Sequence, residues 1–396
     1  MLFARYVPWR ARRSYVYDSV AALLVGLYSG AIFPFLGRIA RGDLHASALQ
    51  ISIMSAAPFI GNLFSPVWAR QMEGRAKVPF VVWSGLAARG LFLLMPLAVT
   101  PSLFVSIAFG SMVIGTIAAP AYASVMKDIY PDDARGRIMG YIRVGAQAAS
   151  LSAALCVGRL LDIASYRLVF PIAAAAGIAG AVAFSRIRAS DGGNGGAKFG
   201  VLDTLRIFSE DPNYRWFALS VFTTGFANLL ASPVYTIFQV DQLHITNTQV
   251  ANLSNLTSLV SIAFYFLWGK YLDHHGPLRT VLLNVIVGAM VPLIYIRADS
   301  VYDLVPAAVC QGISWAGIEL SYINSILFFA DERRVAQYQA LHSALLGVRG
   351  TIAPFFGAFL MHQIGIKPTF AVAFFVSFTG VLMQTLGVKK KYELAG

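Results

Sequence analysis

Long apolar runs alternate along the chain with short polar and charged segments. A helix rises 1.5 Å per residue, so about 20 apolar residues cross the roughly 30 Å hydrocarbon core of a bilayer. Gly and Pro inside these runs do not exclude helices, because membrane helices tolerate both. The pattern predicts twelve spanning helices, at approximately 15–38, 47–70, 79–98, 103–127, 138–161, 168–187, 214–240, 247–270, 278–297, 302–328, 338–361 and 368–388.

One polar segment, residues 188–213, is longer and richer in glycine than the others and falls between the sixth and seventh predicted spans. We expect a cytoplasmic linker between an N-terminal six-helix bundle (1–187) and a C-terminal one (214–396). Its stretch VLDTLRIFS predicts a short interfacial helix. An ordinary long loop is the alternative interpretation of this segment.

The two predicted bundles share short sequence matches in equivalent loops. Matches after the first and seventh spans, and after the fourth and tenth, have one constant offset of 199 residues. The matched pairs are Leu44 and Leu243, His45 and His244, Gln50 and Gln249, Asp132 and Asp331, and Arg135 and Arg334. Two matches at one offset indicate parallel copies, as in a 6+6 transporter.

Composition places most of this chain in lipid. Of its 396 residues, 57% are hydrophobic and only 13% are charged, whereas soluble domains carry roughly 25% charged residues. Cys156 and Cys310 lie in apolar runs without metal-ligand spacing, which argues against a disulfide framework or a zinc site. The sequence therefore predicts an all-α integral membrane protein without a metal site.

The formal charge of +12 is explained by orientation in the membrane. Most Lys and Arg residues fall at the termini and at alternate loops of one side, including Arg12, Arg13, Lys389 and Lys390. By the positive-inside rule, both termini are expected in the cytoplasm, in a cell (inner) membrane protein. The basic residues are scattered rather than clustered with aromatics, so we expect no nucleic-acid partner.

The stretch GKYLDHHGPLR, residues 269–279, combines charge with a Gly-Pro pair after the eighth span. Together with twelve spans and a central linker, it resembles the loop G-x-x-x-D-[RK]-x-G-[RK]-[RK] of the major facilitator superfamily of secondary transporters. Gly269, Asp273 and Gly276 occupy the pattern, His274 replaces the first basic residue, and Arg279 falls one place late. The stretch ARGRIMG (134–140) also resembles that family's loop 4–5.

The first-half copy of this loop, VWARQMEGRAK (67–77), is degraded and has two possible alignments. Alignment on Gly74 puts Gln71 where the acid should be, and alignment of Trp68 with Trp268 puts Glu73 there. The resemblance implies gating roles for Gly269, Asp273, Gly276 and Arg279 in the second half, and for Gly74, Arg75 and Lys77 in the first.

Physical chemistry is consistent with a gating loop. We expect Gly269 to allow close helix packing, Gly276-Pro277 to force a tight turn, and Asp273 to cap the N-terminus of a helix from the other half. The neighbouring His274 and His275 have no further ligand nearby except Asp273, so a metal or catalytic role is disfavoured.

Two charges inside predicted spans are functional candidates, because an ionisable residue in lipid is costly. Glu319 and Arg349 lie near the middle of the tenth and eleventh spans, which are antiparallel neighbours. We expect Glu319 to carry a proton or to face the charge of a substrate, with Arg349 as its neighbour. A structural ion pair between them is the alternative.

Polar and aromatic residues form stripes on two spans that line the cavity in the family that this chain resembles. A stripe of this kind does not suit a lipid-facing surface. The candidates for substrate binding are Gln311, Trp315 and Tyr322 in the tenth span and Thr224, Asn228, Ser232 and Tyr235 in the seventh. Interhelical hydrogen bonding is the alternative role for Asn228.

In the first half, Arg89 lies in the middle of the third span. It is a candidate for an anionic substrate, although the third span is usually peripheral in the resembled fold. Asp18 lies one turn into the first span and is expected to face the headgroups.

We therefore predict a monomeric secondary active transporter that moves a small molecule by alternating access. Proton-coupled export, by antiport, is preferred because of Glu319. A facilitator or organic-anion exchanger that uses the intramembrane arginines is one alternative, and a non-transporting sensor on the same scaffold is another. The chain has no P-loop, HExxH or Ser elbow, so we expect neither an enzyme nor a cofactor.

Overall fold

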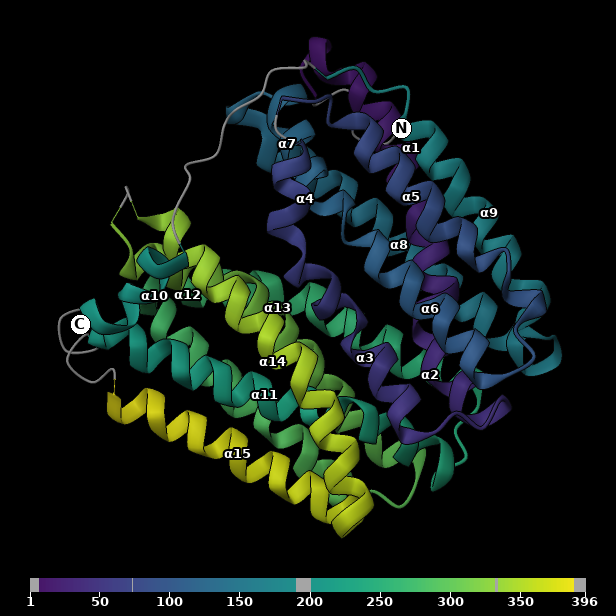
Figure 1. Cartoon of the computed structure of the whole chain (residues 1–396), viewed down its shortest axis with the longest axis vertical. Helices are drawn as coiled ribbons and strands as arrows, with labels where there is room; N and C mark the ends of the chain where they lie inside the picture. The colour runs from purple at the N-terminus through teal and green to yellow at the C-terminus, as the bar shows by residue number, and fades with distance from the viewer. Residues whose placement is uncertain (1–6, 73, 190–200, 332–333, 388–396) are drawn as a thin grey trace. The chain divides into compact units, whose positions relative to one another are not determined.

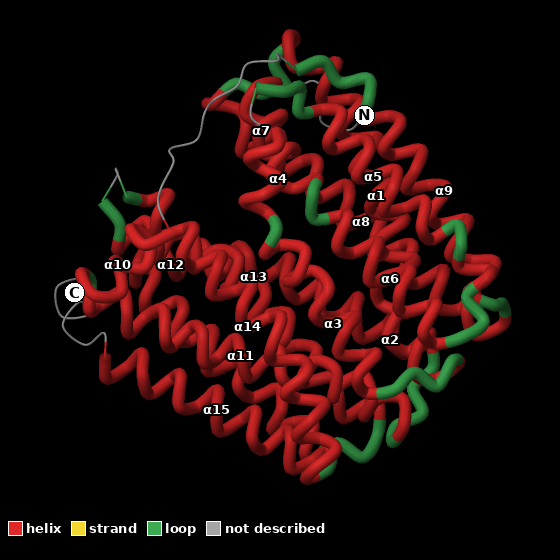
Figure 2. The backbone as a smooth tube through the Cα atoms, in the orientation of Figure 1, coloured by secondary structure: helices red, strands yellow, loops and turns green. Residues whose placement is uncertain are grey.

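The computed structural model describes residues 7–72, 74–189, 201–331 and 334–387, and these form helices joined by short loops, with no strand among them (Figure 2). The principal helices are α1 (Arg12–Ile32), α2 (Leu36–Arg38), α3 (Ala48–Leu63), α4 (Ser65–Met72), α5 (Val78–Phe92), α6 (Pro101–Gly115), α7 (Ala118–Ile129), α8 (Asp132–Ile163), α9 (Tyr166–Phe184), α10 (Val201–Glu210), α11 (Pro212–Asp241), α12 (Asn247–Arg297), α13 (Val305–Phe329), α14 (Val335–Ile364) and α15 (Ile366–Gly387).

Each of the twelve predicted spans overlaps helical structure, but the predicted spans do not correspond one to one with the observed helices. Within the described residues, 9 helices are long and apolar enough to cross a membrane, or 10 if the bent pair α3 and α4 is one span. The 51-residue helix α12 contains two predicted spans, and non-helical Gly276 divides it. Helix α13 has 25 residues but is not one of the 9.

The chain divides into two compact units. Unit 1 comprises Met1–Gly196 together with the short segment Thr246–Asn252, and unit 2 comprises Ala197–Ile245 and Leu253–Gly396. The change from unit 1 to unit 2 falls inside the predicted linker. The exact bundle boundaries at 187 and 214 stay a prediction, and residues 190–200 of the linker lie outside the described residues.

In unit 1, α1 packs most extensively against α8 and α9. Two glycines on α1 allow the close approach of α8. A Cβ added at Gly30 would lie 2.0 Å from the carbonyl oxygen of Ser150, and one added at Gly26 would lie 2.3 Å from that of Ala146. Small residues at such contacts let membrane helices approach backbone to backbone.

In unit 2, α11 runs beside α14 and α15 and has extensive contacts with both (Figure 1). Gly357 of α14 meets α11 closely, because an added Cβ would lie 1.9 Å from the carbonyl oxygen of Leu230. An aromatic group surrounds Tyr214, whose ring centroid lies 4.6 Å from that of Tyr338. Unit 2 thus repeats the use of glycine at a central helix pair.

The short helix expected in the linker is present as α10, and its position at the membrane interface stays a prediction. Ile207 of this helix is fully buried in the core of unit 2. Glu210 at its end forms an ion pair with Arg334, at 2.7 Å between the carboxylate and the guanidinium. The adjacent Asp211 caps α11 by accepting a hydrogen bond from the Tyr214 N–H at 2.9 Å. Helix α10 is therefore attached to unit 2 by both apolar and charged contacts.

The repeat predicted at the loops after the first and seventh spans has the same local structure in both copies. His45 and His244 both have positive φ, at 56° and 48°. Gln50 then accepts a hydrogen bond from the Ser47 N–H at 2.8 Å, and Gln249 accepts one from the Thr246 N–H at 2.9 Å. The copies share a backbone turn and a helix cap.

At the second predicted match, the helix ends that precede the matched residues are offset by one residue more than the matched residues themselves. The C-caps of α7 and α13 are Tyr130 and Ala330, which differ by 200 rather than 199. Arg135 donates to the carbonyl oxygens of Lys127 and Tyr130, whereas Arg334 bonds to Glu210. The matched arginines therefore make different contacts.

Inside unit 1, Asp162 near the end of α8 caps the start of α12. Its carboxylate accepts hydrogen bonds from the backbone N–H groups of Asn247 at 2.9 Å and Thr248 at 3.0 Å. Gly158 permits this approach, because an added Cβ would lie 2.7 Å from the Cβ of Ala251. A carboxylate at a helix N-terminus is favoured by the partial positive charge there.

Candidate functional site

The polar stripe predicted on the tenth span lies on α13. Trp315 is 65% exposed and Glu319 is also exposed, while Gln311 and Tyr322 are half-buried. The opposite side of α13 packs on α12, where the Ser314 hydroxyl donates to the carbonyl oxygen of Asn284 at 3.1 Å. Helix α13 thus has one packed side and one accessible polar side.

Glu319 is held by a residue from the preceding helix. The Tyr265 hydroxyl, on the part of α12 before Gly276, donates a hydrogen bond to the Glu319 carboxylate. Tyr265 is half-buried, so its ring is fixed beside an exposed carboxylate. This arrangement places an accessible acid, with an oriented donor, on the wall formed by α12 and α13.

Arg349 lies in a different environment, between α14 and α11. It is only 5% exposed, and its guanidinium donates a hydrogen bond to the carbonyl oxygen of Val221. Gly225 makes room for it, since an added Cβ would lie 2.2 Å from the guanidinium carbon. The Arg349 Nε has no hydrogen-bond partner among the described residues.

Glu319 and Arg349 therefore have different hydrogen-bond partners, one in α12 and the other in α11. A buried neighbour of Arg349 on its own helix is His342, which lies two turns earlier on α14 and is 8% exposed. Its ring meets that of Tyr322, with centroids 5.1 Å apart. The expected contact between Glu319 and Arg349 is thus not present among the described residues. Glu319 is grouped with Tyr265, and Arg349 is grouped with His342.

Of the four residues in the stripe predicted on the seventh span, two are packed against other side chains or the backbone of the unit and two are half-buried. Thr224 is 2% exposed and donates to the carbonyl oxygen of Ser220 at 3.0 Å. Tyr235 belongs to an aromatic group, with its ring centroid 4.3 Å from that of Tyr295. Asn228 and Ser232 are half-buried and remain predicted substrate contacts.

In unit 1, Arg89 joins the third predicted span to its neighbours. Its guanidinium donates to the carbonyl oxygen of Gly177 at 3.1 Å and lies 5.8 Å from the ring centroid of Tyr28. Asp18 differs from the expectation that it faces headgroups, since it is 1% exposed and accepts a hydrogen bond from Tyr130 at 3.0 Å. The chain folds these charges into interhelical contacts.

The predicted turn in the gating loop is present at Gly276, with φ 75° and ψ 169°. The expected role of Gly269 in close packing is wrong, because a Cβ added there would meet nothing within 4 Å. Asp273 is exposed, and its capping role stays a prediction. The His275 ring stacks on Tyr271, with centroids 4.1 Å apart.

The backbone favours one of the two alignments of the first-half loop. Gly74 has φ 68°, close to the 75° of Gly276, so the two glycines are equivalent and Gln71 occupies the position of Asp273. Lys77 donates to the carbonyl oxygen of Arg75 at 2.9 Å. The side chain of Glu73, the acid in the other alignment, lies outside the described residues.

Several polar residues near the candidates were not singled out from the sequence as a site. Tyr265 gave no pattern of its own, whereas His342 lies seven residues before Arg349, a spacing that shares a helix face. Asn284 is fully buried, and neither atom of its amide group has a hydrogen-bond partner among the described residues. Asp162 was not recognised because its contact is distant in sequence.

Comparison of the sequence with models of protein families identifies the family of this chain. The model of the Major Facilitator Superfamily matches residues 19–228 and 216–393. The chain belongs to the major facilitator superfamily. The superfamily consists of membrane transporters for small molecules, so this protein is a multi-pass membrane protein of transporter type.

Solved structures of major facilitator transporters share the fold. A point mutant of the nucleoside transporter NupG has a TM-score of 0.78 at 11% identity, covering 94% of this chain and 99% of its own. A bacterial homologue of the human lysosomal transporter Spinster, inward-facing and unoccupied, has a TM-score of 0.62 at 14% identity, covering 98% and 97%. No curated protein sequence matches significantly.

Proposed function

We propose that this protein is a secondary active transporter that exports a small molecule by alternating access, coupled to the movement of protons in the opposite direction. Glu319 with its Tyr265 partner is the observation that carries the proposal. A carboxylate inside a spanning segment is costly unless it has a function or a partner. Here the carboxylate is accessible and has an oriented hydrogen-bond donor.

Glu319 in this mechanism carries the transported proton. In its charged form it accepts the hydrogen bond from the Tyr265 hydroxyl, and protonation removes the charge that this bond stabilises. A solute that binds beside Trp315 and Gln311 then lies next to a neutral carboxylic acid when Glu319 is protonated, and next to a carboxylate when it is not. Binding of the proton and of the solute are linked through that one group.

We also propose that the protein works as a monomer in the inner membrane with both termini in the cytoplasm. The asymmetric distribution of Lys and Arg between the loops supports this orientation. The gating roles of Asp273, Arg75 and Lys77 belong to the same proposal. Gly74 and Gly276 share a positive φ, which supports equivalent turns in the two halves.

The test is proton movement in proteoliposomes, followed with a pH-sensitive dye while small solutes are screened. We expect solute-dependent proton flux in the wild type and its loss in Glu319→Gln, with solute binding retained. Tyr265→Phe removes the donor but keeps the carboxylate, and we expect reduced flux. Glu210→Gln is the matched control, because Glu210 is likewise an exposed carboxylate with a hydrogen-bonding partner, Arg334, but lies at the end of α10 and outside the predicted spans.

Solute movement without proton flux, unchanged in Glu319→Gln, would contradict proton coupling. The protein would then be a facilitator or an organic-anion exchanger. Arg349 gives that second candidate its basis, since its buried guanidinium has an unpartnered Nε among the described residues. Loss of anion uptake in Arg349→Gln would favour it. Absence of any transport or proton flux would favour a sensor.

A further inference from the structure

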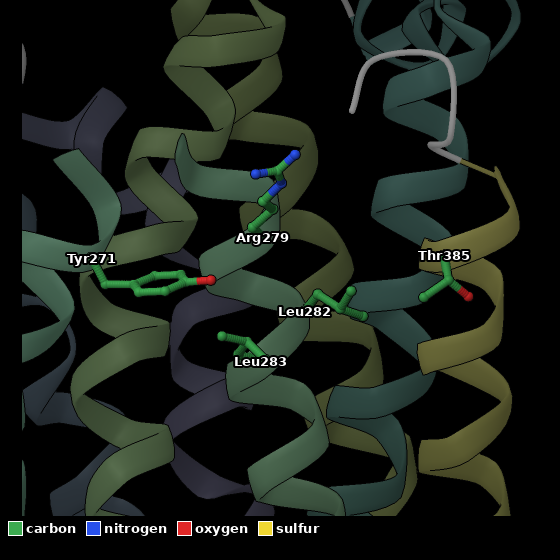
Figure 3. A pocket seen from close by; sticks show the side chains of 5 residues that line it. All are labelled: Tyr271, Arg279, Leu282, Leu283 and Thr385. Carbon is green, nitrogen blue, oxygen red and sulfur yellow. The ribbon is translucent and has the colours of Figure 1, made fainter. Parts of the chain in front are cut away.

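A cavity open to the surface lies in unit 2 beside the gating loop, where the second part of α12 begins and α15 ends, and none of its lining residues belongs to the group around Glu319. Its volume is about 340 Å³, and it is lined by Tyr271, Arg279, Leu282, Leu283 and Thr385. Figure 3 shows Tyr271 extending from the first part of α12 toward the second part, which carries Arg279. Thr385 faces them from α15.

The position of the cavity corresponds to the boundary between lipid and water. Arg279 is the third residue after the break at Gly276, and Thr385 lies two residues before the end of α15. Both spanning segments therefore end beside the cavity. Phospholipid headgroups occupy this level of a bilayer.

The lining combines one cation, Arg279, and the side chains of Tyr271 and Thr385, which carry hydroxyl groups, with the apolar side chains of Leu282 and Leu283. Arg279 is exposed, and the described residues give it no hydrogen-bond or ion-pair partner. The helix that starts after Gly276 also has its N-terminus here, and the partial positive charge of a helix N-terminus favours anions. Leu282 and Leu283 form an apolar floor that suits hydrocarbon, not water.

The apolar surface continues from the cavity along both helices. Leu283 and Ile286 on α12 are each 38% exposed, while Leu382 and Leu386 on α15 are 42% and 75% exposed. Exposed apolar side chains on membrane-spanning helices face lipid chains. A ligand of the cavity is thus in contact with hydrocarbon on one side and with Arg279 on the other.

We propose that this cavity binds an anionic glycerophospholipid. Its phosphate lies at Arg279, and the part of one acyl chain nearest the headgroup lies on Leu282 and Leu283. Basic pockets between spanning helices are suited to anionic headgroups. A soluble phosphate would gain the contact with Arg279 but leave the apolar wall uncovered. The lipid satisfies both parts of the lining, which is why the cavity fits it better.

The experiment measures lipid retention by native mass spectrometry after delipidation. Wild-type protein is mixed with dioleoyl phosphatidylglycerol or dioleoyl phosphatidylcholine at equal concentration. We expect Arg279→Gln to lower phosphatidylglycerol retention about fivefold, the effect of one basic residue near an anionic surface. Arg297→Gln is the matched control, an exposed arginine at the other end of α12, and should retain lipid like the wild type.

A second variant tests the apolar wall without changing charge. Leu283→Trp fills the cavity with a larger apolar side chain, and we expect it also to lower phosphatidylglycerol retention. Equal retention by the wild type and Arg279→Gln would overturn the proposal, as would equal retention of the two lipids. Full competition by glycerol 3-phosphate would show a soluble anion site instead of a lipid site.

Discussion

Single residues in this protein take their roles from the groups that the fold places beside them. Glu319 is exposed beside a tyrosine hydroxyl, whereas Arg349 is buried against the backbone of α11. Both are charged residues in predicted spans, and the sequence placed them at a similar depth as possible partners of each other. The difference arises because Gly225 leaves room for a guanidinium at one helix pair.

Asp303 allows a test of charge and stability. It falls at the edge of the predicted span 302–328, but the structure places it in the short helical turn Val301–Leu304, before α13 begins at Val305. Asp303 accepts hydrogen bonds from the backbone N–H groups of Asp299 at 3.1 Å and Ser300 at 2.8 Å. These bonds, with that of Asp299 the largest cause, lower the pKa of Asp303 from its ordinary value of 3.8. A lowered pKa means that the charged form stabilises the folded protein.

Asp303→Asn is therefore expected to lower the Tm slightly at about pH 7, where the carboxylate is fully charged. The stabilisation is present above the unfolded-state pKa and is lost as pH falls through the lower folded-state pKa. The difference in Tm between wild type and variant should shrink below about pH 4. Thermal unfolding in detergent across this pH range measures it.

Asp273→Asn is the control for this series, because Asp273 is exposed and the described residues give it no partner. Its Tm should follow the wild type at every pH. A Tm difference for Asp303→Asn that does not change with pH would mean that hydrogen-bond geometry, rather than charge, accounts for the effect.

At the scale of the helix, close approach depends on glycines that face a neighbouring backbone. Gly30 of α1 meets the carbonyl of Ser150 on α8, and Gly357 of α14 meets that of Leu230 on α11. The closest atoms are backbone oxygens, which cannot rotate away from an added methyl group. These contacts set the spacing of the central helices in both units.

Gly30→Ala should destabilise the protein by about 1–3 kcal/mol, the range for overpacking a packed interior. Gly140→Ala, on α8, is the matched control, since an added Cβ there meets nothing within 4 Å. The control should be neutral or stabilising, because alanine favours a helix over glycine by about 1 kcal/mol. Thermal unfolding of both variants measures the difference in stability. Equal stability of Gly30→Ala and Gly140→Ala would contradict a role for Gly30 in close helix packing.

At the scale of the whole chain, the internal repeat is visible as structure as well as sequence. The turns at His45 and His244 have the same backbone conformation and lead into the same type of helix cap. Both histidines are exposed, so their side chains contribute little packing. The left-handed conformation is unfavourable for residues other than glycine.

We therefore expect His45→Gly and His244→Gly each to stabilise the protein by about 1 kcal/mol, because glycine adopts positive φ without a steric cost. His45→Val and His244→Val should each destabilise it, since a branched Cβ is least tolerated there. Thermal unfolding of the four variants compares the two copies. Opposite effects in the two copies would contradict their structural equivalence.

The sequence by itself determined the features that depend on local chain properties. Each span needs a fixed length of apolar residues, so the apolar runs located helical segments, although α13 and the bent pair α3 and α4 show that the division into spans was less exact. Positive φ at Gly276 followed from its Gly-Pro turn. The stretch VLDTLRIFS in the linker likewise predicted the helix that is present as α10.

The tertiary structure decided which distant residues meet, because these contacts depend on helix rotation and spacing that no local pattern contains. It placed Tyr265 beside Glu319, buried Asp18 under Tyr130, and left the space beside Gly269 open. A helical period tells which residues share a face, but not which neighbour that face meets. Packing of whole helices makes that choice, and with it the partners of each charge.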